Sequence, residues 1–66
     1  MKVAIASDHG GLNLRGYLVR HLRENGHQVV DLGPESGGSV DYPDFAKLVT
    51  NAVLSGEAER GILVCG

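Results

Sequence analysis

Two unbroken apolar runs in the chain predict strands that are covered on both faces. The first is residues 3–6, within a predicted strand at residues 2–6, and the second is residues 62–66, which open after Gly61 and close on Cys-Gly. Continuous apolar character is typical of parallel strands that lie between two layers of helices. Another strand is predicted between them in the chain, at residues 27–32.

Residues 12–25 repeat apolar side chains with the period of an amphipathic helix. Asn25 and Gly26 end this helix, because glycine tolerates the left-handed conformation of a helix cap. The arginines of the segment, Arg15 included, are assigned mainly to its solvated face. The predicted buried stripe comprises Leu14, Leu18, Val19 and Leu22.

A second helix is predicted to begin at residues 41–44. Pro43 suits the first helical position, and the aspartates on either side suit the positive end of the helix dipole. Ser55 and Gly56 end it. Residues 33–40, rich in glycine and serine, predict a loop at the carboxyl end of a strand, where binding loops are common. The predicted buried face of the helix comprises Phe45, Val49, Ala52 and Val53.

The order strand, helix, strand, helix, strand predicts an α/β fold with parallel strands and right-handed crossovers. Two sheets satisfy this order. In the order 2-1-3 the helices lie on opposite faces and form a three-layer α/β/α arrangement, whereas in the order 1-2-3 they share one face. The apolar runs of the first and third strands favour 2-1-3, because both faces of these strands are then covered.

Composition narrows the classes of function. The chain has 66 residues, a net charge of −2 and one cysteine, so an internal disulfide is excluded and no paired Cys/His spacing predicts a metal site. Dispersed charge does not indicate nucleic-acid binding. No apolar run approaches the ~20 residues of a membrane span, and the amino terminus passes directly into a predicted strand rather than a signal peptide. We expect a cytoplasmic, reducing setting.

The short chain also predicts a partner. A domain of this size buries only about 60% of the surface that its unfolded chain exposes. Neither a disulfide nor a metal is available to compensate for so small a core. We therefore expect association with a second copy or with a further part of the fold.

Chemically useful side chains follow the ends of the first and third predicted strands. Asp8 and His9 follow the first, and Cys65 lies at the end of the third. Ligands of open α/β sheets bind outside the carboxyl ends of the strands. If these two strands are neighbours, Asp8, His9 and Cys65 are expected to face one pocket.

Each candidate also has a structural interpretation. A free cysteine in an apolar strand is most often a small core residue, and Asp8 fits an Asx turn that leaves a surface imidazole beside it. Tyr42 is interpreted most simply as packing over the start of the second helix. Gly10 and Gly11 permit close approach to a phosphate, but the dinucleotide and P-loop fingerprints are absent.

Three motifs taken together resemble the ribose-5-phosphate isomerase B family, which includes isomerases of galactose and allose 6-phosphates. They are VAIASDHGG at residues 3–11, VDYPD at residues 40–44 and GILVCG at residues 61–66. The resemblance runs the whole length of the chain. It implies a Rossmann-like parallel sheet and a cytosolic homodimer or tetramer that interconverts aldose and ketose phosphates without a metal or organic cofactor. Because family members are roughly twice as long, residues 1–66 resemble the amino-terminal part of the domain, up to the third of five strands.

The resemblance also implies roles in the site. Cys65 matches the base that moves a proton between C1 and C2 through a cis-enediolate. Asp8 matches a residue that binds sugar hydroxyls, and His9 one near the ring oxygen or phosphate. Gly66 matches the first residue of a glycine-rich loop whose N–H groups stabilise the enediolate oxygen. Tyr42 matches a tyrosine of the pocket.

The expected reaction is therefore the interconversion of ribose 5-phosphate and ribulose 5-phosphate, with this part of the domain inactive alone. Three other hypotheses remain open. The chain is alternatively a non-catalytic α/β half-domain that assembles through its sheet edge, or an isomerase of a six-carbon sugar phosphate. A nucleotide or flavin domain is disfavoured by the missing phosphate fingerprint.

Overall fold

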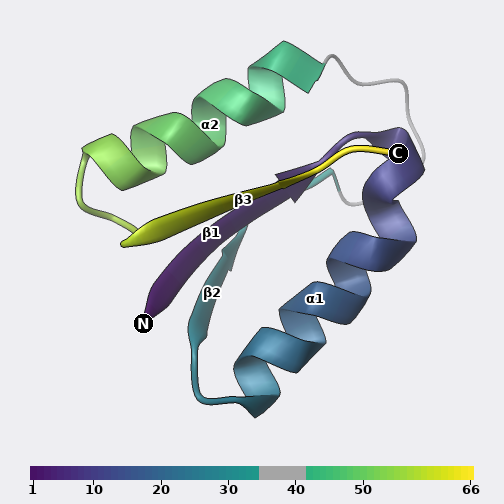
Figure 1. Cartoon of the computed structure of the whole chain (residues 1–66). Coiled ribbons are helices and arrows are strands. Elements are labelled where there is room, and N and C mark those ends of the chain that lie inside the picture. Colours follow the sequence, from purple (N-terminus) through teal and green to yellow (C-terminus); the bar gives the residue numbers. More distant parts are fainter. Residues whose placement is uncertain (35–41) are drawn as a thin grey trace.

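The computed structural model describes residues 1–34 and 42–66, which form a sheet between two helices (Figure 1). The strands are β1 (Lys2–Ser7), β2 (Gln28–Asp31) and β3 (Arg60–Val64). The helices are α1 (Leu12–Glu24) and α2 (Tyr42–Leu54), and a short 3₁₀ helix, η1 (His9–Gly11), precedes α1. Most of the loop predicted at residues 33–40, and Asp41, lie outside the described residues.

The sheet has the order β2-β1-β3, and both pairings are parallel. β1 is therefore the central strand, and α1 and α2 cover opposite faces of the sheet (Figure 1). This arrangement confirms the predicted order 2-1-3 and excludes the order 1-2-3. Within the described ranges, neither helix is long and apolar enough to cross a lipid bilayer.

β1 divides the core in two, because successive side chains of a strand point to opposite faces. Ala4 and Ala6 pack on the side of α2, and Ile5 packs on the side of α1. All three side chains are 0% exposed. The predicted buried face of α2 is confirmed, since all four of its residues pack in the first of these clusters. That cluster also contains Val49, Ala52, Ala58, Phe45 and Val53, and the second contains Val19, Val64 and Leu18.

The buried face of α1 differs from the predicted one. Leu14 is 54% exposed, whereas Arg15 is 6% exposed. The helix therefore turns Arg15 toward the sheet together with Val19, and the prediction that Arg15 lies on the solvated face is wrong. A pattern of apolar residues cannot identify a buried position occupied by a charged side chain with internal partners. The residues that face the sheet have the helical spacing i, i+3, i+4, i+7 and are Arg15, Leu18, Val19 and Leu22.

β3 is more exposed than its apolar sequence predicts. Val64 is buried, but Leu63 is 37% exposed and Ile62 is half-buried. In the described sheet β3 is an edge strand whose partner is β1. The prediction of a strand covered on both faces is therefore correct for β1 and wrong for β3. The strand also ends at Val64, so that Cys65 follows it.

Two glycines allow a matched test of how α2 packs on the sheet. A Cβ added to Gly61 would lie 2.5 Å from Cγ1 of the buried Val49, whereas a Cβ added to Gly16 would have no neighbour within 4 Å. We expect Gly61→Ala to lower the free energy of unfolding by about 1–3 kcal/mol, because α2 has to move away from β3. Gly16→Ala should raise it by up to about 1 kcal/mol, because alanine favours the helix. Urea denaturation measures both, and an undiminished stability of Gly61→Ala would contradict this packing.

Candidate functional site

The carboxyl ends of β1 and β3 lie side by side. Ser7 pairs with Val64 in the parallel register, and the Asp8 N–H donates a hydrogen bond of 3.1 Å to the Val64 carbonyl. The chain therefore leaves both strands at the same level of the sheet. Asp8 and Cys65, the residues that follow the two strands, are brought together at this edge.

The Asp8 carboxylate joins the two chain segments. Its Oδ1 accepts hydrogen bonds from the Gly11 N–H at 2.9 Å and the Gly66 N–H at 3.0 Å, and its Oδ2 lies 3.2 Å from the same Gly66 nitrogen. The pKa of Asp8 lies below its ordinary value of 3.8, mainly because the carboxylate accepts a hydrogen bond from the Gly66 N–H. Partial burial raises this pKa, whereas the Gly11 N–H and the Cys65 thiol lower it further. A carboxylate with several donors is stabilised in its charged form. Asp8 is therefore a fixed negative charge that anchors residues 65–66.

Glycines on both segments allow their backbones to touch. A Cβ on Gly10 would lie 3.0 Å from the Gly66 Cα, and a Cβ on Gly11 would lie 2.9 Å from the Val64 carbonyl oxygen. A Cβ on Gly66 would overlap the backbone of Gly10. Gly10 and Gly11 are interpreted from the sequence as permitting close approach to a phosphate, and that interpretation does not predict the contact that they make with residues 64–66.

Two of the remaining candidates, Cys65 and His9, adjoin in sequence the glycines of this contact. Cys65 is a free cysteine with an exposed side chain, and His9, which begins η1, is also exposed. Tyr42 is the first residue of α2, but its side chain lies outside the described part of the chain. Its role in a pocket, like the substrate-binding and catalytic roles of the other candidates, stays a prediction. Among residues 1–34 and 42–66, no cluster of three His, Cys, Asp or Glu side chains could hold a metal ion.

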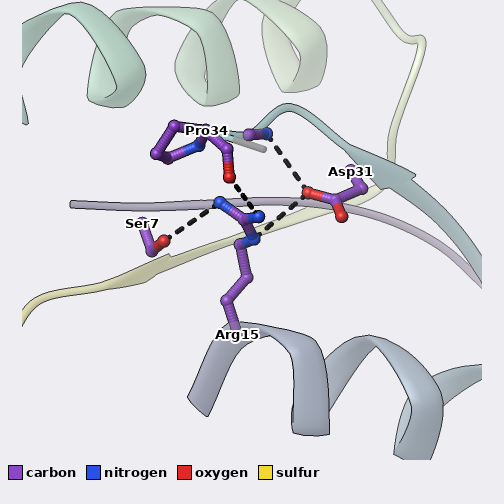
Figure 2. A network of polar contacts seen from close by, with 5 residues as sticks. Ser7, Arg15, Asp31 and Pro34 are labelled. Atoms are coloured by element: carbon purple, nitrogen blue, oxygen red, sulfur yellow. Dashed lines mark hydrogen bonds and ion pairs between the residues drawn. The ribbon is translucent and has the colours of Figure 1, made fainter. Parts of the chain in front are cut away.

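A buried arginine beside the site was missed by the sequence interpretation. Arg15 Nη1 donates to Ser7 Oγ over 3.1 Å, Nη2 donates to the Pro34 carbonyl, and Nε lies 3.3 Å from Asp31 Oδ1 (Figure 2). Ser7 directly precedes Asp8 in the chain. The signal that could have identified this residue is its position in register with the apolar stripe of α1.

The state of Asp8 predicts a specific pH dependence of stability. Because the pKa of Asp8 is lower in the folded than in the unfolded chain, ionised Asp8 stabilises the fold above its ordinary pKa of 3.8. This contribution is lost as the pH falls through the lower, folded pKa. The difference in unfolding free energy between wild type and Asp8→Asn should therefore be constant well above 3.8 and shrink at lower pH.

Chemical denaturation over a series of pH values measures this difference. Glu57→Gln is the matched control, because Glu57 is exposed and precedes β3 at the opposite end of the sheet. The control should not reproduce the pH-dependent loss. If the difference in unfolding free energy between wild type and Asp8→Asn were the same at every pH, this would contradict the proposal that ionised Asp8 stabilises the fold.

Comparisons with known proteins point to one family. Residues 3–66 match the Ribose/Galactose Isomerase family. A putative sugar phosphate isomerase of Bacillus subtilis is 52% identical over 67 residues, which cover 100% of this chain and 45% of that protein. Ribose-5-phosphate isomerase B of Escherichia coli is 45% identical over 65 residues, covering 98% of this chain and 44% of that protein.

A solved structure gives the same result for the fold. Ribose-5-phosphate isomerase B of Clostridium thermocellum matches with a TM-score of 0.96 and 50% sequence identity, covering 100% of this chain and 45% of that one. The chain thus spans less than half the length of these relatives. Since the family match extends from residue 3 to residue 66, and the fold agrees with that of a solved relative, the chain belongs to the Ribose/Galactose Isomerase family.

Proposed function

We propose that this protein is an aldose–ketose isomerase that interconverts ribose 5-phosphate and ribulose 5-phosphate. The observation that carries the proposal is the hydrogen bond from the Gly66 N–H to the Asp8 carboxylate, which brings Cys65, the residue before Gly66, to the same edge as Asp8. It gathers a carboxylate, a thiol and a backbone donor at the carboxyl edge of a parallel sheet, where ligands bind. Membership of a family of sugar isomerases supports the reaction class, and the names of the relatives support the five-carbon substrate.

Cys65 is the proposed base. Aldose–ketose isomerisation moves a proton between C1 and C2, and a single group that accepts the proton from one carbon and returns it to the other is sufficient. Cys65 is exposed, so a substrate can reach its sulfur. Asp8 lies at the same edge, but its lowered pKa makes it a poor proton acceptor. The thiolate is the reactive form of a cysteine.

The substrate is proposed to bind over the same edge. His9 is exposed beside Asp8 and offers an imidazole donor to the ring oxygen or phosphate. Gly66 is proposed to present its N–H to the enediolate oxygen. Because this N–H donates to Asp8 in the free chain, a bound substrate has to share it or displace the carboxylate, which is then available to sugar hydroxyls. Tyr42 is proposed to line the pocket.

This mechanism uses a thiol and hydrogen-bond donors and requires neither a metal nor an organic cofactor. Its base has to remain a free thiol, because a disulfide or an oxidised sulfur cannot accept a proton. We therefore place the protein in the cytoplasm, where thiols are kept reduced.

We also propose that residues 1–66 are the amino-terminal part of the isomerase domain and that the free edge of β3 is covered by the rest of that domain. A groove of about 330 Å³ runs between β3 and α2, and the relatives extend over more than twice as many residues as they share with this chain. An uncovered apolar groove beside an unpaired strand edge favours association. The groove is lined by Val49, Thr50, Val53, Leu54, Gly61 and Leu63.

The role of Cys65 is tested in a chimaera that joins this chain to the unmatched remainder of the Bacillus subtilis relative. Cys65→Ala is expected to lower kcat for ribose 5-phosphate by about 10²–10⁴-fold, the usual contribution of a general base. Binding of the sugar phosphate should be nearly unchanged, because the substituted atom reacts and does not hold the phosphate. Ser55→Ala, which follows α2 at the opposite end of the sheet, is the control. Undiminished turnover of Cys65→Ala would refute the assignment.

The chain by itself is expected to be weakly active or inactive. Each missing donor to the enediolate oxygen costs about 10²–10³-fold in rate. Proton NMR of ribose 5-phosphate in deuterated water measures exchange of the C2 proton, and the expected result is no exchange beyond that of Cys65→Ala. Exchange that depends on Cys65 would show that the described edge already suffices for proton transfer. A solution mass above that of the monomer, with no turnover in the chimaera, would instead favour a non-catalytic half-domain that assembles through β3.

A further inference from the structure

Arg15 is a charged side chain held inside the fold. It belongs to α1, yet its side chain is 8% exposed and it packs at the carboxyl ends of two strands. Removing a guanidinium from water is strongly unfavourable unless partners satisfy its donors. The position of Arg15 therefore depends on the groups that surround it.

Those groups come from separate parts of the chain (Figure 2). Ser7 Oγ, at the end of β1, accepts from Nη1 at 3.1 Å, and the Pro34 carbonyl, beyond β2, accepts from Nη2. Asp31, the last residue of β2, lies 3.3 Å from Nε. Among the described residues the Nε–H has no hydrogen-bond acceptor, and this third contact is an ion pair. One side chain of α1 thus joins the ends of β1 and β2.

The same groups are tied to one another. Asp31 Oδ1 accepts the Gly33 N–H over 3.1 Å, and the Gly33 carbonyl accepts the Ser7 N–H over 3.1 Å. On the other side, the Asp8 N–H donates to the Val64 carbonyl. The backbone is therefore held on both sides of the Ser7 Cα, because Gly33, beyond β2, binds the Ser7 N–H and Val64, at the end of β3, binds the Asp8 N–H. Arg15 fixes the Ser7 side chain between them.

We propose that Arg15 is a positioning residue for Asp8, which locks the end of β1 so that the Asp8 carboxylate meets the Gly66 N–H. The guanidinium suits this role because its planar fork reaches several acceptors at once, whereas a lysine ammonium is a single point on a flexible stem. The consequence for catalysis depends on the proposed function. The geometric consequence does not.

The geometric part is tested on this chain with Arg15→Met, which fills similar space without charge or donors. Carbon-13 NMR titration of the carboxylates measures the pKa of Asp8, and the amide shift of Gly66 reports its hydrogen bond. In Arg15→Met the pKa of Asp8 is expected to rise toward 3.8, and the Gly66 amide to lose its hydrogen-bonded shift. Arg20→Met, an exposed arginine of the same helix, is the control and should change neither. A folded Arg15→Met with an unchanged Asp8 titration would overturn the proposal.

A milder variant covers the case in which Arg15→Met does not fold. Ser7→Ala removes one hydroxyl acceptor and leaves the charge of Arg15 paired with Asp31. Ser7→Ala should raise the pKa of Asp8 by a smaller amount than Arg15→Met does. In Arg15→Lys the pKa of Asp8 should lie between its values in wild type and in Arg15→Met. A normal Asp8 titration in folded Ser7→Ala and Arg15→Lys would likewise overturn the proposal.

The catalytic part is measured in the chimaera with the Bacillus subtilis relative. Arg15→Met is expected to lower kcat by about 10–100-fold, because small displacements of a site group cost rates of this order, while Arg20→Met keeps the wild-type kcat. Partial rescue by Arg15→Lys would support positioning. An inactive chimaera with Arg15 intact would count against the proposed function alone, because the Asp8 titration would still decide the role of Arg15.

Discussion

The parallel pairing of β1 with both of its neighbours is the constraint on which the rest of the structure depends. β1 is buried on both faces, with alanines toward α2 and Ile5 toward α1, and its two edges are occupied by β2 and β3. Right-handed crossovers then place the helices on opposite faces. All three strands end at one edge, so the residues that follow them meet there whatever their separation in the chain.

At that edge, the Asp8 carboxylate makes structural contacts with two segments of the chain. The Asp8 carboxylate begins η1 by accepting the Gly11 N–H, and it also holds the residues after β3 through the Gly66 N–H. Its negative charge is stabilised by donors, so it remains ionised near neutral pH. An anchor of this kind organises a site in advance of its ligand, which lowers the cost of orienting groups when the ligand binds.

The sequence predicted the fold well, because its strongest signals are local and agree with one another. The apolar run of β1, the stripe of α2 and the glycine at residue 26 each have one simple interpretation; Gly26 indeed has a φ of 84°. Other features depend on tertiary context. Arg15 looked solvated because its partners lie 8 and 19 residues away at Ser7 and Pro34, and β3 looked buried because its pattern cannot tell an edge strand from a central one.

The candidate site was located from the sequence, but its internal contacts were not. Strand order places Asp8 beside Cys65, and family resemblance names the same residues. Neither predicts that the Asp8 carboxylate accepts hydrogen bonds from backbone N–H groups, or that the backbones of Gly10 and Gly66 are in contact. Such contacts depend on the exact relative positions of two loops, which residue patterns do not encode.

The hydrogen bond between the Gly66 N–H and the Asp8 carboxylate is the most direct test of this account, because it exists only if β1 and β3 pair in the described register. Nuclear magnetic resonance can detect it as a scalar coupling between the Gly66 amide nitrogen and the Asp8 carboxyl carbon. We expect a measurable coupling and an amide that exchanges slowly with solvent. An absent coupling, with an amide that exchanges as fast as in an unfolded chain, would contradict it.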